Sequence, residues 1–125
     1  MLGSMAIKRI PDDDGMSALR AHRSGDRSRT VVATSVRFLL QVLADRAPGH
    51  TVEMRVPPFG AVQCVEGPRH TRGTPPNVIE CDPETWIALA LGGLEWREAM
   101  SEARVAASGQ RANLAGLLPV LRLRD

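Results

Sequence analysis

Residues 51–82 of this 125-residue chain read Thr-Val-Glu-Met-Arg-Val-Pro-Pro-Phe-Gly-Ala-Val-Gln-Cys-Val-Glu-Gly-Pro-Arg-His-Thr-Arg-Gly-Thr-Pro-Pro-Asn-Val-Ile-Glu-Cys-Asp. Apolar and polar residues alternate over 51–56, which predicts a half-buried strand, and the Pro-Pro pair that follows ends it. Further strands are expected over 61–65 and 77–81. The stretch therefore predicts a hairpin, a long connection and a third strand.

The connection, residues 66–77, contains three prolines and two glycines, which exclude a helix or a strand. Arginine, histidine and hydroxyl side chains beside flexible glycines suit an anionic head group or a protein partner. Four residues are the candidates for this contact: Arg69, His70, Thr71 and Arg72. The alternative is that the two arginines pair with nearby carboxylates and only lock the loop, and the carboxylates would be Glu66, Glu80 or Asp82.

Upstream of the hairpin, residues 30–47 predict a helix that Ser28 or Thr30 caps. Its polar side chains fall on one narrow stripe, and the rest of its surface is apolar. A helix that rests on a single sheet needs an apolar arc of about 100° or more, and this arc is much wider. Either a second layer covers the excess, such as the N-terminal arm or another subunit, or part of the arc lines a ligand cavity. The stripe consists of Thr34, Arg37, Gln41 and Asp45.

Downstream, Asp82 followed by proline begins a helix that ends at a Gly-Gly pair. A short helix is expected over 96–103, a strand over 104–108 and a last helix over 113–118. The tail, 120–125, fits a strand or a fraying end. A hairpin and helices segregated in this way predict an α+β domain with a mainly antiparallel sheet over residues 30–125.

Residues 1–29 are polar and are expected to form a flexible or loosely docked N-terminal arm with a short helix over 16–22. The net charge of +2 lies in this arm, because basic and acidic residues balance over 31–125. A neutral domain with few aromatic residues does not suit nucleic-acid binding. The chain has no apolar run long enough to span a membrane and no signal-peptide pattern, so a cytoplasmic protein is expected.

The sequence offers little for catalysis or metal binding. Cys64 and Cys81 lie in apolar strands, where free cysteine behaves as a small buried hydrophobe. A metal site with His50 or His70 is the alternative, but the spacing of these residues fits no common zinc motif. His70 is a possible general base with Glu66 as a possible partner, but no nucleophile or nucleotide motif accompanies them. We therefore expect a non-catalytic protein with no cofactor and no metal.

Two blocks of the chain resemble the bacterial branch of the sterol carrier protein superfamily. The first is residues 56–82, quoted above. The second runs from the Thr-Trp pair at 85–86 through the glycine turn at 92–93 to residue 118. The resemblance implies a twisted, mainly antiparallel sheet of about five strands, covered on one face by helices. It also implies an apolar cavity between sheet and helices that holds lipids.

On this basis we expect the domain to bind or transport a lipid or another hydrophobic or amphiphilic small molecule. The alternative is a protein-interaction or regulatory module, or a homodimer, that uses the loop 66–77 and the helix 30–47 as docking surfaces. The candidate cavity residues are Phe38, Leu39, Val42, Met54, Phe59, Val62, Ile79, Trp86, Leu89 and Leu118.

Overall fold

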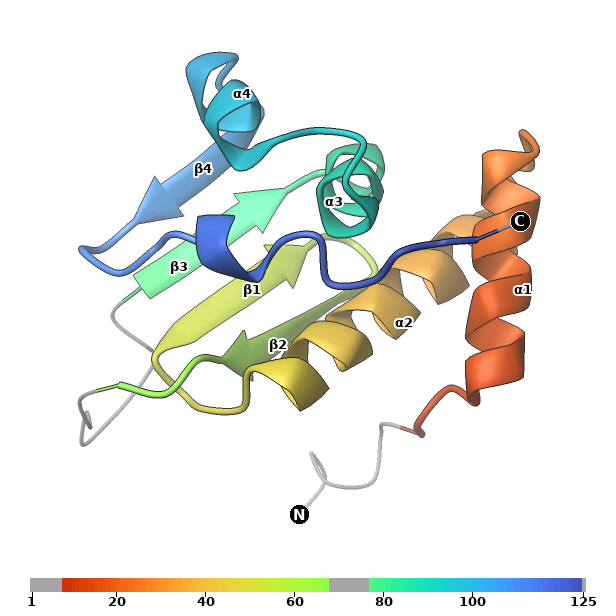
Figure 1. The fold of residues 1–125 in the computed structure, drawn as a ribbon, viewed down its shortest axis with the longest axis horizontal. Coiled ribbons are helices and arrows are strands. Elements are labelled where there is room, and N and C mark those ends of the chain that lie inside the picture. The colour runs from red at the N-terminus through yellow and green to blue at the C-terminus, as the bar shows by residue number, and fades with distance from the viewer. Residues whose placement is uncertain (1–7, 68–76, 125) are drawn as a thin grey trace.

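The computed structural model describes residues 8–67 and 77–124 (Figure 1). Every helix and strand predicted between residues 30 and 108 is present, with bounds that differ by one or two residues. The elements follow the order α1 (Asp12–Arg23), α2 (Arg29–Arg46), β1 (Val52–Val56), β2 (Gly60–Cys64), β3 (Asn77–Cys81), α3 (Pro83–Leu91), α4 (Trp96–Ser101), β4 (Val105–Ser108) and the 3-10 helix η2 (Ala115–Leu117).

The sheet is mixed and contains four strands in the order β2-β1-β3-β4. β1 pairs with β2 antiparallel and with β3 parallel, and β3 pairs with β4 antiparallel. The predicted number of about five strands is corrected to four for the described residues, and the sheet is mixed, with two of its three pairs antiparallel. The parallel pair arises because Val52 pairs with both Cys64 and Asn77, so β3 starts at the same end of the sheet as β1. β2 ends at that same end, because its last residue, Cys64, also pairs with Val52, and β3 adds to the free edge of β1.

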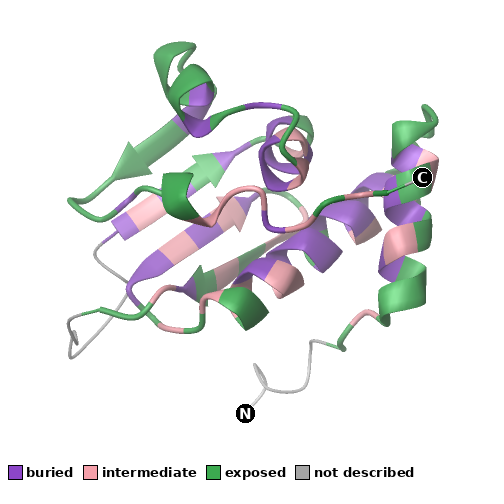
Figure 2. Cartoon of the chain, in the orientation of Figure 1, coloured by how far each residue is buried: buried purple, intermediate pink, exposed green. Residues whose placement is uncertain are grey.

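Alternation along the strands places the core on one face of the sheet. Figure 2 shows buried and less buried residues alternating along β1 and β3. Val52, Met54 and Val56 are fully buried and belong to one hydrophobic cluster with residues of α2 and α3. Trp86 of α3 is also fully buried, and its indole Nε1 donates a hydrogen bond to the Val36 carbonyl of α2 at 3.3 Å. The two helices are thereby fixed to each other above the sheet.

The ends of α3 follow from local sequence. The Asp82 side chain accepts a hydrogen bond from the Thr85 backbone amide at 3.1 Å, which satisfies one of the free donors at the start of the helix. Gly92 ends the helix with a φ of 89°, a left-handed conformation that costs glycine little. These signals were readable in the sequence, and the predicted bounds of α3 are confirmed.

Helix α1 packs on α2 on the side away from the sheet (Figure 1). Leu19 is fully buried, and Gly15 lies so close to the Phe38 ring that a Cβ atom there would be 2.3 Å from it. The structure thus differs, over residues 12–23, from the expected loosely docked arm. The reason for the close packing is the wide apolar arc of α2, which the sheet covers on one side only. Helix α1 covers the other side and is the second layer that was one of the two explanations for this arc.

The C-terminal region differs from the prediction of a helix over 113–118. The structure has only the single 3-10 turn η2 there. Asn113 Oδ1 accepts a hydrogen bond from the Ala115 backbone amide at 2.7 Å, which competes with helix formation. The following tail is not a fifth strand, because the Val120 amide donates to the Ala90 carbonyl of α3 rather than to a sheet edge.

Candidate functional site

A groove runs along α2, between this helix, the edge strand β2 and residues 8–10. Its volume is about 720 Å³, within the range of roughly 300–1,000 Å³ that is typical of small-molecule sites. Apolar side chains contribute most of its lining, so it can accommodate a hydrophobic group. The lining residues are Lys8, Arg9, Ile10, Thr34, Arg37, Leu40, Gln41, Ala44, Asp45, Phe59, Gly60, Ala61 and Val62.

The polar stripe of α2 lies in this groove. All four of its members, Thr34, Arg37, Gln41 and Asp45, are among the lining residues. The stripe was recognisable in the sequence, but no site was predicted for it. The residue types could have indicated a site, because an arginine, an amide and a carboxylate lie along one line of an otherwise apolar helix. Such side chains have hydrogen-bonding capacity that neighbouring segments can use.

Residues 8–10, which we call the N-terminal strap, are held against this stripe at two points. The Ile10 amide donates to Gln41 Oε1 at 2.9 Å, and Gln41 Nε2 donates back to the Ile10 carbonyl at 3.0 Å. One residue earlier, the Arg9 guanidinium donates to both carboxylate oxygens of Asp45, at 3.2 and 2.6 Å. The strap therefore forms one wall of the groove in a defined position.

The contact between Arg9 and Asp45 is electrostatic as well as geometric. The side-chain hydrogen bond from Arg9 lowers the pKa of Asp45 below its ordinary value of 3.8. The same hydrogen bond raises the pKa of Arg9. Both side chains are half or more exposed to water, which screens their attraction. The pair consequently sets the position of the strap and cancels charge locally more than it stabilises the fold.

Phe59 forms the end of the groove nearest the turn between β1 and β2. Arg37 Nε donates to the Phe59 carbonyl at 2.8 Å, and its guanidinium lies 5.9 Å from the centre of the Phe59 ring. The Arg29 guanidinium lies 5.1 Å from the same ring. Cations near an aromatic face interact with its quadrupole. This end of the groove therefore combines an apolar ring with positive charge.

A second hollow lies on the other side of the strap, between α1 and the first turns of α2. It has a volume of about 740 Å³ and shares Lys8, Arg9, Ile10 and Thr34 with the groove. It is shallower, and residues of α1 such as Asp14 and Ala21 form its far wall. The two hollows thus adjoin each other at the strap and at Thr34 of α2.

The structure divides the ten predicted cavity residues into two groups. Six of them lie inside the hydrophobic core and are almost inaccessible: Phe38, Leu39, Met54, Ile79, Trp86 and Leu89. The other four, Val42, Phe59, Val62 and Leu118, are partly buried and pack against the core. Only Phe59 and Val62 line the groove described above. The prediction thus found the side chains between sheet and helices, whereas the groove lies on the outer side of α2.

The predicted contact residues of the long loop, Arg69, His70, Thr71 and Arg72, lie outside the described residues. Their role, and that of the loop as a docking surface, stays a prediction. The start of the loop is described and is tightly placed. The Val65 amide donates to the Ala47 carbonyl at 2.6 Å, and a Cβ atom at Gly67 would lie 2.6 Å from Thr51 Oγ1.

Both cysteines are buried and free. Burial raises the pKa of the Cys64 thiol to about 11 and that of Cys81 to about 12, so both stay protonated at neutral pH. His50, offered as a metal ligand in the alternative interpretation, contacts Gln63 Oε1 through Nδ1 at 2.7 Å. Within the described ranges, no group of three or more histidine, cysteine or acidic side chains is placed to hold a metal ion.

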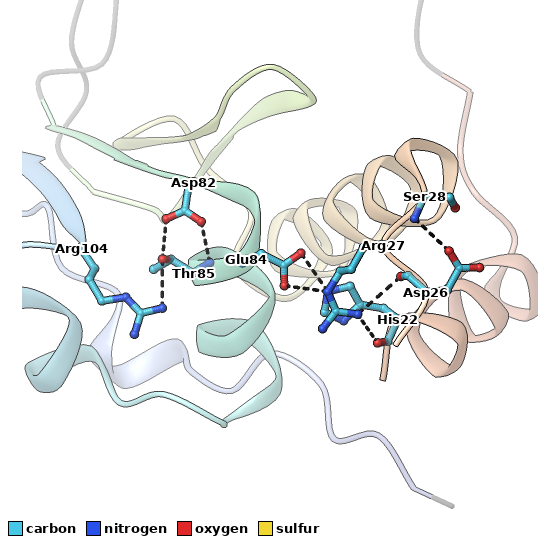
Figure 3. Close-up of polar contacts among 8 residues, drawn as sticks. All are labelled: His22, Asp26, Arg27, Ser28, Asp82, Glu84, Thr85 and Arg104. Carbon is cyan, nitrogen blue, oxygen red and sulfur yellow. Dashed lines mark hydrogen bonds and ion pairs between the residues drawn. The ribbon is translucent and has the colours of Figure 1, made fainter. Parts of the chain in front are cut away.

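Another polar cluster joins α1 to α3 (Figure 3). Nε2 of His22 lies 2.9 and 3.1 Å from the two carboxylate oxygens of Glu84. Arg27 reaches the same carboxylate at 3.4 Å and donates to the His22 carbonyl. The sequence analysis did not single out His22 or Glu84, because the pairing joins residues 62 positions apart. The cluster fixes helix positions and lies away from the groove.

The second cluster of Figure 3 completes the start of α3. Thr85 Oγ1 donates to Asp82 Oδ1, and Arg104 Nη2 donates to Thr85 Oγ1 at 3.3 Å. These contacts tie the residue before β4 to the first turn of α3. The hydroxyl of the buried Thr85 thereby has both a hydrogen-bond acceptor and a donor as partners.

Together these features define a small α+β domain with a hydrophobic core between sheet and helices and an external groove beside its longest helix. Residues 28–120 match the family model described as "Bacterial SCP ortholog". The chain therefore belongs to the bacterial sterol-carrier-protein-like family, as its sequence blocks indicated. A search of curated proteins gives no match. No helix within the described ranges is long and apolar enough to cross a membrane.

Proposed function

We propose that this domain binds a hydrophobic or amphiphilic small molecule in the groove between α2, β2 and the N-terminal strap. The observation that carries the proposal is the groove itself, with a volume of about 720 Å³ and a mainly apolar lining. Ile10, Leu40 and Val62 would contact the hydrophobic part of the ligand. Membership of a sterol-carrier-like family supports the same ligand class.

We also propose that the domain acts by binding and not by catalysis. The polar clusters of the described residues have structural tasks that account for them. The pair of His22 and Glu84 joins two helices, and Asp82 with Thr85 caps α3. The thiols of Cys64 and Cys81 are buried and protonated at neutral pH, which makes them poor nucleophiles.

The test uses two matched substitutions in the full chain. Ala44 lines the groove and Ala21 lines the second hollow, and both are only partly buried helix residues. Ala44→Phe fills the groove, so bound amphiphile detected by native mass spectrometry and titration with dodecanol should fall about tenfold, a change of ~1.4 kcal/mol. Ala21→Phe should leave binding at the level of the unsubstituted protein.

Two results would refute the proposal. One is a purified protein that carries no lipid and binds neither dodecanol nor a fluorescent acyl probe. The other is equal binding by the two phenylalanine variants, which would move the ligand away from the groove. Circular dichroism of both variants checks that the helices remain folded.

A further inference from the structure

The charges of the groove do not balance. Three basic residues, Lys8, Arg9 and Arg37, and one acidic residue, Asp45, line it. Basic and acidic side chains are equal in number over residues 31–125, and the excess in the groove arises because Lys8 and Arg9 of the N-terminal arm line it. A surplus of one sign inside a mainly apolar groove favours a ligand of the opposite sign, because apolar walls weaken the screening by water.

One of the three basic residues is already neutralised. Both oxygens of the Asp45 carboxylate accept hydrogen bonds from Arg9, in a fork that matches the guanidinium geometry. Because Asp45 already occupies the guanidinium of Arg9, this side chain is less available to bind the carboxylate of a ligand. The net positive charge that remains for a ligand therefore belongs to Lys8 and Arg37.

Neither Lys8 nor Arg37 has a carboxylate partner in the described part of the chain. Arg37 is nevertheless held in place, because its Nε donates to the Phe59 carbonyl at 2.8 Å. A hydrogen bond to a neutral carbonyl positions the guanidinium without cancelling its charge. Arg29, whose guanidinium lies 5.1 Å from the centre of the same ring, adds a second cation at this end of the groove. An anchored cation with uncompensated charge is suited to bind an anion.

We propose that the groove selects a single-chain amphiphile with a terminal carboxylate, whose acidic group is bound by Lys8 and Arg37. The hydrocarbon chain lies along the apolar lining formed by Leu40, Ala44 and Val62. This inference rests on the proposed function and adds the charge of the ligand to it. It commits to a free monomeric acid, because basic and acidic side chains balance over residues 31–125, whereas binding to an anionic membrane surface favours a strongly basic segment.

The first test compares ligands of equal chain length below their micelle concentrations. Calorimetric titration with dodecanoic acid, dodecanol and dodecyltrimethylammonium should give tightest binding for the acid, about tenfold over the alcohol. The cation should bind weakest. Raising the salt concentration should weaken binding of the acid and leave the alcohol unchanged.

The second test uses charge variants in the full chain. Arg37→Gln and Lys8→Gln should each reduce the affinity for the acid about three- to tenfold, with little change for dodecanol. Arg55→Gln is the matched control, because Arg55 lies on the uncovered face of the sheet and pairs with Glu53 at 3.0 Å. It should leave the preference for the acid intact.

The third test predicts a gain of affinity. Asp45→Asn keeps the shape of the side chain and one hydrogen-bond acceptor for Arg9, but it removes the negative charge from the groove wall. Binding of dodecanoic acid should tighten about threefold while binding of dodecanol stays constant. A substitution that only loosened the strap would change both ligands in the same direction.

The outcomes separate this inference from the proposed function. Binding of the alcohol as tightly as the acid, or equal losses for both ligands in Arg37→Gln, overturns the charge assignment and leaves amphiphile binding intact. Absence of binding for all three ligands refutes both. Association with phosphatidylglycerol vesicles without uptake of the free acid also overturns the inference, because it assigns the cations to a membrane surface.

Discussion

Substitution of Gly15 by alanine tests the packing of α1 on α2, on which the position of the strap depends. A Cβ atom at Gly15 would lie 2.3, 2.3 and 2.5 Å from three atoms of the Phe38 ring. Cβ contacts below 3.0 Å are essentially never seen, so either the ring or the helix must move. Phe38 is only 3% exposed and has little space to yield. We expect α1 to move away from α2.

Two effects of opposite sign determine how much Gly15→Ala destabilises the packing of α1 on α2. Alanine in a helix interior is favoured over glycine by about 1 kcal/mol. Overpacking a core site costs typically 1–3 kcal/mol, and the upper part of that range, about 2–3 kcal/mol, applies because a Cβ atom fixed to the backbone cannot rotate away. The net loss is therefore about 1–2 kcal/mol, which corresponds to a factor of roughly 5–30 in the equilibrium between docked and undocked α1.

Hydrogen exchange followed by mass spectrometry measures this equilibrium directly. Amides of α1 in Gly15→Ala should exchange roughly 5–30 times faster, while amides of β1 and β3 keep their protection. Ser17→Ala, on the exposed side of the same helix, is the matched control and should not accelerate exchange. The double variant Gly15→Ala with Phe38→Leu should regain part of the protection. Slower exchange of α1 in the single variant would refute the close packing.

Three further outcomes are expected. Asn77→Ala should cost about 2–4 kcal/mol in urea unfolding because it removes two hydrogen bonds of a buried amide, whereas Asn113→Ala, which loses one exposed bond, should cost about 1 kcal/mol or less. The free energy of unfolding should decrease as pH rises from about 9 towards 11 and 12, because the unfolded chain releases the thiol protons of Cys64 and Cys81 that the folded state retains. Urea unfolding midpoints measured over this pH range should therefore decrease less in the Cys→Ala variants. A carbon-13 NMR titration should place the carboxyl pKa of Asp45 below 3.8, and replacing its arginine partner should raise it.

Local sequence signals were sufficient for most elements of this fold. A serine cap, an Asp-Pro start and a Gly-Gly stop each act over a few residues, and each is found where it was expected. The strands at Val52–Val56 and Asn77–Cys81 followed from alternation alone. Their parallel pairing did not, because β3 could add to either edge of the hairpin, and only the edge formed by β1 makes the pairing parallel. That is a non-local choice with no signal in the strand residues themselves.

The helix predicted near the C-terminus shows how local signals can compete. Leu114 is fully buried, as the apolar spacing indicated. Asn113, Gly116 and Pro119 nevertheless fall within seven residues, and each disfavours a continuing helix. Leu114 is buried in the core although the backbone around it does not form a full α-helical turn. The apolar pattern therefore identified what is buried but not the backbone that buries it.

The candidate site was predictable only in part, for a similar reason. Val42, Phe59 and Val62 were selected as lining residues on the assumption that a cavity lies between sheet and helices. Six of the ten predicted residues are nearly inaccessible in the described structure, and a groove is found where α2, β2 and the strap meet. No sequence pattern places Ile10 beside Gln41, because the contact joins a residue of the arm to the middle of α2.

Part of the groove is formed by residues that lie outside the region matched by the family model. The family match begins at residue 28, after the strap and α1. Lys8, Arg9 and Ile10 form one wall of the groove and lie before that point, whereas their partners Gln41 and Asp45 lie within the matched region. The matched domain therefore supplies the floor and one wall, and the preceding segment supplies the other. A ligand preference that depends on Lys8 is consequently a property of this chain, and it need not extend to relatives in which a different segment precedes α2.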